Sequence, residues 1–168
     1  MDTTIIPYKY FNIKNFDKDE VEILRASCAI PFVSNIVKYQ GKLYLDGGMA
    51  DAIPLKKSES DGYEKNVVIL TKSPSFVRKK SSANILIKLK YRKYPKFVKV
   101  FANRHHSYAE AFDYVNKRAQ EGSVFLIQPL HDGVSRLEKN INKLTAAYQE
   151  GYDTAKKRYP ELIKFMGK

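Results

Sequence analysis

An aspartate followed by two glycines, Asp46-Gly47-Gly48, is the stretch of this sequence whose residue types are best suited to chemistry. A positioned carboxylate can take the proton of a serine hydroxyl, which is a poor nucleophile at neutral pH without such a base. Neighbouring glycines let the backbone turn tightly and leave room for a substrate to approach. The alternative is an ordinary turn at the end of a hairpin, in which Asp46 only caps a backbone amide.

Three segments around this loop stand in a definite order. Ala26-Ser27-Cys28-Ala29-Ile30-Pro31-Phe32 ends a predicted helix, Gly41-Lys42-Leu43-Tyr44-Leu45 leads into the loop, and Asp51-Ala52-Ile53-Pro54 follows it. As a set they resemble the patatin-like phospholipase family, and a bacterial subgroup in particular. The resemblance implies part of a lipid acyl hydrolase, a phospholipase or esterase, whose substrate is a lipid or phospholipid ester. It implies that Asp46 is the base of a Ser-Asp dyad, with Gly47 and Gly48 as the supporting loop.

The serine that this dyad needs is absent from the sequence. In the family, the nucleophile lies in a Gly-x-Ser-x-Gly elbow, and a glycine-rich loop supplies the oxyanion hole. Gly133-Val134-Ser135-Arg136-Leu137 lacks the last glycine, and Asp46-Gly47-Gly48-Met49 lacks the glycine and arginine that should follow in an oxyanion loop. The resemblance therefore implies a truncated chain, the C-terminal portion only, as a fragment, a split gene product or a degenerate copy. We expect such a chain alone to be catalytically silent.

The same resemblance extends weakly to the C-terminus, through Val67–Leu70, Tyr91–Pro95 and Tyr148–Tyr152. It implies an α/β fold with a layered α/β/α sheet of the patatin type, incomplete because N-terminal elements are absent. We expect a single domain over residues 1–168, with C-terminal helices at 135–166. A parallel sheet without its elbow strand has an unpaired apolar edge, so we expect self-association or pairing with the N-terminal part.

Local patterns predict the individual elements. Asp17 with Glu20 has the spacing of a capping box, which predicts a helix start. A hairpin should turn at Gln40-Gly41, and apolar runs predict buried strands in a parallel sheet. The predicted strands span 5–13, 36–39, 43–45, 67–70 and 124–127, and further helices should begin at Ser107 and Ser135.

The charge of the chain is concentrated in one segment. The net charge is +12, and twelve Lys or Arg with no Asp or Glu lie between Lys65 and Ala109. Such a segment sets the long-range field and could attract phospholipid headgroups or nucleic acid, although a solvated basic face is the simpler interpretation. The candidates for an anionic-surface contact are Arg78, Lys79, Lys80, Arg92 and Lys93.

A rival function follows from this charge: a non-enzymatic basic module that binds anionic lipid or nucleic acid through residues 65–104. Nucleic acid is the less favoured partner, because the aromatic residues of the segment recur every three or four positions. That spacing indicates the buried side of a helix rather than a platform for stacking bases. These residues are Tyr91, Tyr94, Phe97 and Phe101.

Other residues of catalytic or metal-binding type have simpler interpretations. Cys28 is expected to pack in the core, and the adjacent His105 and His106 should point to opposite sides of any regular element. His131, Asp132 and Ser135 lie within five positions, whereas the members of a triad usually converge from distant segments. We expect neither a metal nor a cofactor.

Composition is typical of a soluble globular protein, with 43% hydrophobic and 29% charged residues. No apolar run approaches the roughly 20 residues that span a bilayer, and no signal-peptide pattern is present. The single cysteine, Cys28, excludes an internal disulfide and suits a reducing compartment. We expect a cytoplasmic protein, which the basic segment could hold at the periphery of a membrane.

Overall fold

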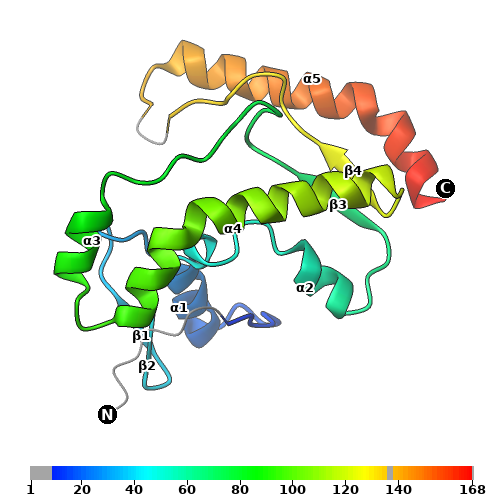
Figure 1. Ribbon diagram of the computed structural model, residues 1–168. Coiled ribbons are helices and arrows are strands. Elements are labelled where there is room, and N and C mark those ends of the chain that lie inside the picture. Colours follow the sequence, from blue (N-terminus) through cyan, green and yellow to red (C-terminus); the bar gives the residue numbers. More distant parts are fainter. Residues whose placement is uncertain (1–8, 136–137, 168) are drawn as a thin grey trace. The chain divides into compact units, whose positions relative to one another are not determined.

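The computed structural model describes residues 9–135 and 138–167 (Figure 1). They form two compact units, one from residues 9–53 with Arg78–Ala111 and the other from Pro54–Val77 with residues 112–135 and 138–167. The chain passes between the units three times, the last time within a single long helix. A single domain over residues 1–168 stays a prediction.

Both units combine helices with a small two-stranded sheet. Unit 1 contains α1 (Lys18–Ser27), β1 (Val37–Tyr39), β2 (Lys42–Tyr44), the 3-10 helix η1 (Gly47–Met49), α3 (Asn84–Lys90) and the first part of α4 (Pro95–Gln120). Unit 2 contains α2 (Leu55–Ser60), β3 (Asn66–Ile69), the end of α4, β4 (Val124–Ile127) and α5 (Ile141–Met166).

The start of α1 confirms the predicted capping box. The Asp17 carboxylate accepts a hydrogen bond from the backbone N–H of Glu20 at 2.8 Å. In return, the Glu20 carboxylate accepts from the backbone N–H groups of Lys14, Asn15 and Phe16. These backbone bonds, that from Lys14 first, lower the pKa of Glu20. The strand predicted over 5–13 is wrong where the structure describes it, because residues 9–13 form no strand.

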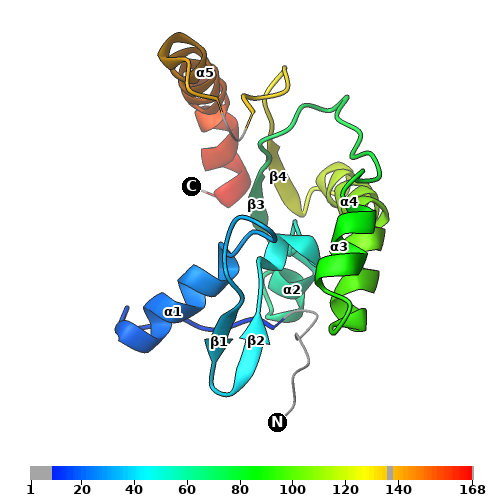
Figure 2. The same ribbon diagram turned by 90° about the vertical axis from the view of Figure 1, so that its left-hand side faces the viewer.

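The predicted hairpin is confirmed. β1 and β2 pair antiparallel with Val37 opposite Tyr44, and Figure 2 shows them beside α1. The turn residues Gln40 and Gly41 have φ of 46° and 75°. Two left-handed residues make a type I′ turn, whose twist matches that of the flanking strands. The hairpin therefore delivers the chain into the Asp46 loop in the expected order.

The core of unit 1 contains the aromatic row that the sequence predicted. Tyr91, Phe97 and Phe101 are buried, and their rings follow one another with centroids 4.9 and 6.2 Å apart. They belong to one apolar cluster with residues from α1, the hairpin, η1 and α3: Ala26, Ala29, Val37, Tyr44, Leu45, Met49 and Ile87. Phe97 and Phe101 thus lie on the buried side of α4, as the spacing indicated. Tyr91 ends α3 and Tyr94 precedes α4, so the four residues do not form one side of a single helix as expected.

Unit 2 is built on a parallel pair of strands. β3 and β4 pair in parallel, with Asn66 opposite Val124 and Ile69 opposite Ile127, and α5 packs against β4. β4 is largely buried, whereas Val67 and Ile69 of β3 are 42% and 68% exposed. The α/β class therefore holds, but a layered sheet of the patatin type is not seen among the described residues.

Two predicted helix starts are wrong. Ser107 lies inside α4, which already begins at Pro95, a residue well suited to the first helical position. α5 begins at Ile141 and not at Ser135, because the side chain of Asn140 accepts from the backbone N–H of Lys143 and caps the helix there. Residues 136 and 137 of the predicted start lie outside the described residues.

Several large apolar side chains of α5 are exposed. Ile141, Tyr148 and Tyr152 are 75%, 70% and 52% exposed. None of the helices that the structure describes is long and apolar enough to cross a bilayer.

Replacement of Asn140 by alanine should lower the free energy of unfolding by about 1 kcal/mol, because the first turn of α5 loses its side-chain cap. Ser107→Ala is the matched control. It lies exposed inside α4, where alanine is the better helix former, so stability should stay equal or rise slightly. Urea titration followed by circular dichroism measures both; a loss in Ser107→Ala and none in Asn140→Ala would contradict the observed helix starts.

Candidate active site

The Asp46 loop is anchored to the end of α1 by the backbone. Asp46 directly follows the buried Leu45, and its backbone N–H donates to the carbonyl oxygen of Ala29 at 2.9 Å. On the other side of the loop, Met49 is buried in the core of unit 1. Apolar side chains on both sides thus hold a half-buried carboxylate in place.

One oxygen of the carboxylate makes a local hydrogen bond. Asp46 Oδ1 accepts from the backbone N–H of Gly48 at 2.8 Å and caps the short helix η1. Oδ2 forms no hydrogen bond with any residue that the structure describes. The capping role that the sequence left open is therefore present, and it occupies one of the two oxygens. A role in proton transfer remains compatible with this geometry.

The two glycines of the loop differ in how much space they have. A Cβ atom added to Gly48 would lie 3.1 Å from Asp46 Oδ1, whereas one added to Gly47 would meet nothing within 4 Å. Neither glycine has a positive φ. A side chain at Gly48 would thus crowd the Asp46 carboxylate, which would have to shift by a few tenths of an ångström, whereas a side chain at Gly47 would not.

A second carboxylate lies close in sequence, but its environment is different. The hydroxyl group of Tyr10 donates to Asp51 Oδ2. This bond joins the segment before α1 to the segment after η1, both within unit 1. The side chain of Asp51 thus bonds to a residue from a distant part of the chain, whereas the side chain of Asp46 bonds to Gly48 in its own loop.

A serine and an aspartate do meet in unit 2, but the pair cannot serve as a dyad. Ser73 donates from its hydroxyl group to Asp132 Oδ1 at 2.8 Å and from its backbone N–H at 3.2 Å. These bonds, the hydroxyl first, lower the pKa of Asp132. Ser73 is only 1% exposed, so no substrate can reach its oxygen. The pair joins the segments that follow β3 and β4.

The remaining candidates from the sequence are dispersed. His131 Nδ1 lies 3.4 Å from Glu150. The rings of His105 and His106 are 4.1 Å apart, so the expectation that they point to opposite sides is wrong. Cys28, expected in the core, is exposed because α1 ends at Ser27 and Ala26 takes the buried position.

Across residues 9–135 and 138–167, no three His, Cys, Asp or Glu residues gather as metal ligands do.

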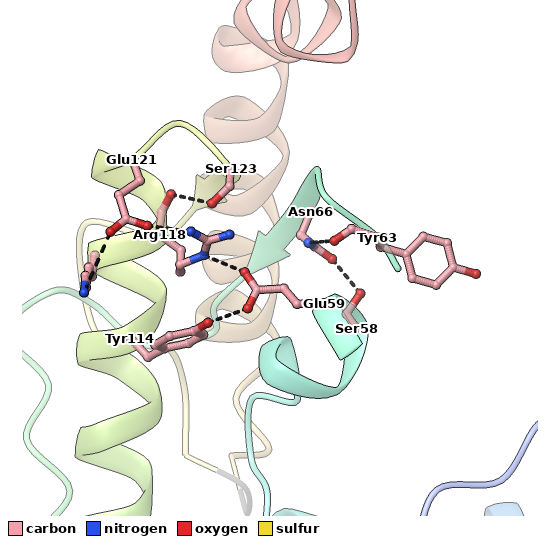
Figure 3. A network of polar contacts seen from close by, with 9 residues as sticks. Ser58, Glu59, Tyr63, Asn66, Tyr114, Arg118, Glu121 and Ser123 are labelled. Carbon is pink, nitrogen blue, oxygen red and sulfur yellow. Dashed lines mark hydrogen bonds and ion pairs between the residues drawn. The ribbon is translucent and has the colours of Figure 1, made fainter. Parts of the chain in front are cut away.

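A polar network in unit 2 was missed by sequence reasoning (Figure 3). Glu59 on α2 accepts from the hydroxyl group of Tyr114 and, at 2.6 Å, from Arg118 Nε, both on α4. Arg118 also binds Glu121. The Tyr114 bond, followed by Arg118, lowers the pKa of Glu59, and the Glu59 bond raises the pKa of Tyr114. Tyr114 and Arg118 are one helical turn apart, but nothing in the sequence indicated Glu59 as their partner.

Four of the five anionic-surface candidates are exposed: Lys79, Lys80, Arg92 and Lys93. Arg78 is half-buried, and its guanidinium lies 4.4 Å from the centre of the Tyr108 ring. Arg78 is thus partly used within unit 1.

Residues 7–57 match the model of the patatin-like phospholipase family. The matched segment contains α1, the hairpin, η1 and Asp46. Residues 94–167 match another model, a domain of unknown function (DUF6363). The match lies at the N-terminal end of this chain, so the expectation that the chain is the C-terminal portion of a patatin-like domain is not matched. The patatin match also does not extend to Tyr148–Tyr152, which lies in the segment that the other model covers.

A relative of this segment is the uncharacterized protein YjjU of Escherichia coli (strain K12), which is 46% identical over 52 residues. The matched stretch makes up 30% of this chain and 15% of YjjU. The chain thus spans a small fraction of that relative.

Replacing Gly48 by alanine should weaken the cap of η1, because the added Cβ crowds Asp46 Oδ1. We expect a loss of about 1 kcal/mol in the free energy of unfolding, the usual size of a lost cap. Gly47→Ala is the control in the same turn, and it should change stability by less than about 0.5 kcal/mol. Equal effects of the two substitutions in thermal unfolding would contradict the close approach of Asp46 to Gly48.

Glu59→Gln should lower stability at neutral pH by about 1–2 kcal/mol, because two hydrogen bonds to a charged acceptor are weakened. The pKa of Glu59 is lower in the folded state than its ordinary value of 4.5. Its contribution is therefore complete above pH 4.5 and is lost as the pH falls through the folded value. The difference between wild type and variant should shrink below pH 4.5 in thermal unfolding.

The exposed Glu161, which pairs with Arg158 on the surface of α5, provides the control Glu161→Gln. A surface pair contributes little, so this variant should follow the wild type at every pH. If Glu59→Gln also followed the wild type, the network would not stabilise unit 2.

Proposed function

We propose that Asp46 is the general base of a Ser-Asp dyad that hydrolyses lipid esters. The observation that carries the proposal is the state of its carboxylate within the segment that matches the patatin-like family. Oδ1 is fixed by Gly48, and Oδ2 has no hydrogen bond to any residue that the structure describes. A base needs such an arrangement, with its direction fixed and one oxygen available to a hydroxyl group.

In the reaction, Oδ2 takes the proton of a serine hydroxyl while the serine oxygen attacks the ester carbonyl carbon. The proton then passes to the alcohol oxygen of the substrate as its bond to the carbonyl carbon breaks. Water attacks the acyl-serine next and gives a proton to the same carboxylate, which returns it to serine as the fatty acid leaves. One aspartate thus serves both half-reactions.

The serine must come from outside these 168 residues. The sequence contains no Gly-x-Ser-x-Gly segment, and Ser73, which does meet a carboxylate, is buried. We therefore infer that Asp46 acts together with a segment of the same polypeptide or of another chain.

The first test uses the 168-residue chain alone with a short-chain nitrophenyl ester. We expect no turnover above buffer and no labelling by a fluorophosphonate, which reacts with activated serines. If the chain alone hydrolysed the ester and Asp46→Asn abolished this hydrolysis, the inference that the serine comes from outside these residues would be wrong.

The second test grafts residues 7–57 into a patatin-like phospholipase of measured esterase activity, in place of its own corresponding segment. The graft should hydrolyse the ester, and Asp46→Asn should lower kcat/KM by about 1,000-fold, because the serine then lacks its base.

Asp51→Asn in the same graft is the control, since Asp51 is engaged by Tyr10. It should lower kcat/KM by less than about tenfold. A folded, active graft in which Asp46→Asn has no larger effect than Asp51→Asn would refute the role of Asp46.

A further inference from the structure

The helix α3 exposes one apolar side. Ile85, Leu86 and Leu89 are 79%, 60% and 68% exposed. At about 100° per residue, they occupy a single arc of the helix, and Ile87, which is 1% exposed, lies on the opposite side in the core of unit 1. Contiguous large apolar side chains on a surface mark an interaction site more often than isolated ones.

Basic residues frame this arc. On the helical wheel, Lys88 and Lys90 fall on the two sides of the three aliphatic residues, and both are exposed. Exposed basic residues also precede and follow the helix: Lys79, Lys80, Arg92 and Lys93. Among the described residues, no acidic side chain forms an ion pair with any of these six. We call the three aliphatic and six basic residues the α3 surface.

The side of α3 opposite the α3 surface is packed into the core of unit 1. Tyr91, at the end of α3, is buried, and its hydroxyl oxygen accepts a hydrogen bond from the backbone N–H of Phe32 at 3.2 Å. The rings of Phe32 and Tyr91 meet edge to face, and Lys90 Nζ lies 4.9 Å from the centre of the Phe32 ring. The adjacent Val33 is 81% exposed. The aliphatic side chains are thus exposed on a helix whose other side is buried.

We propose that the α3 surface docks on an anionic lipid bilayer. Ile85, Leu86 and Leu89 enter the boundary between headgroups and acyl chains, and the surrounding Lys and Arg side chains contact lipid phosphates. A helix with an apolar face and flanking lysines is typical of interfacial binding, because long basic side chains reach the headgroups while their stems stay apolar. Residues 65–109 contain no Asp or Glu, so no acidic side chain of this segment repels the anionic headgroups.

A nucleic-acid partner would account for the six basic residues of the α3 surface but not for its three aliphatic ones, since these find no partner on a phosphate backbone. The proposal does not rest on Asp46, because docking requires no hydrolysis. The two can therefore fail separately.

The test measures sedimentation of the full chain with vesicles of phosphatidylcholine, alone and mixed with phosphatidylglycerol. We expect binding to the mixed vesicles at low salt, at least tenfold weaker binding to the neutral ones, and weakening by added salt. The combined variant Ile85→Gln, Leu86→Gln, Leu89→Gln should reduce binding at least tenfold. Its control replaces exposed apolar residues of α5 by glutamine, namely Ile141, Leu144 and Tyr148, and should bind within twofold of the wild type.

A second pair of variants isolates the position of the charge. Glutamine at Lys79, Lys80, Arg92 and Lys93 should abolish most binding. The control removes an equal number of positive charges from unit 2, by glutamine at Lys139, Lys143, Lys156 and Lys157, and should retain binding. Wild-type binding by either α3 variant would overturn the proposal, as would equal losses in variant and control. Salt-dependent binding to duplex DNA with none to the mixed vesicles would also overturn it.

Discussion

The position of the Asp46 carboxylate depends on two hydrogen bonds, each donated by a backbone N–H group. The bond from Asp46 N–H to the Ala29 carbonyl fixes the loop to the end of α1, and the bond from Gly48 N–H to Oδ1 fixes the side chain. Both partners of each bond lie within a stretch of twenty residues, so the arrangement follows from the order of helix, hairpin and loop. A carboxylate held in this way loses little conformational freedom on meeting a hydroxyl group, which is the condition that a general base must satisfy.

The Asp46 loop and the α3 surface share one core. Ala29 and Met49 next to the loop, and Ile87 and Tyr91 beneath the α3 surface, belong to the same apolar cluster of unit 1. The two proposed activities therefore rest on the same packed residues, although neither uses the other's side chains. If α3 binds a bilayer, the unit that carries Asp46 is held at the surface where lipid esters are found.

Sequence reasoning succeeded where structure is set by near neighbours. The Asp17–Glu20 capping box, the Gln40-Gly41 turn and the buried pair Phe97 and Phe101 on α4 all involve residues a few positions apart. It failed where two local signals competed, since Ser107 and Ser135 have good cap spacing but Pro95 and Asn140 begin the helices. Contacts between distant segments, such as Glu59 with Tyr114 and Arg118, leave no local pattern and were missed.

Capping and catalysis are often treated as exclusive roles for an aspartate, yet Asp46 shows why they need not be. A carboxylate has two oxygens, and a backbone N–H that binds one of them restricts the rotation of the group without blocking the other. In the Ser73–Asp132 pair, the serine oxygen is buried and cannot reach a substrate. Accessibility of the reacting oxygen, rather than the presence of a serine beside an aspartate, therefore separates a possible dyad from a structural bond. By that criterion the Ser73–Asp132 pair is a structural bond, whereas the proposed role of Asp46 is consistent with its second oxygen having no hydrogen bond among the described residues.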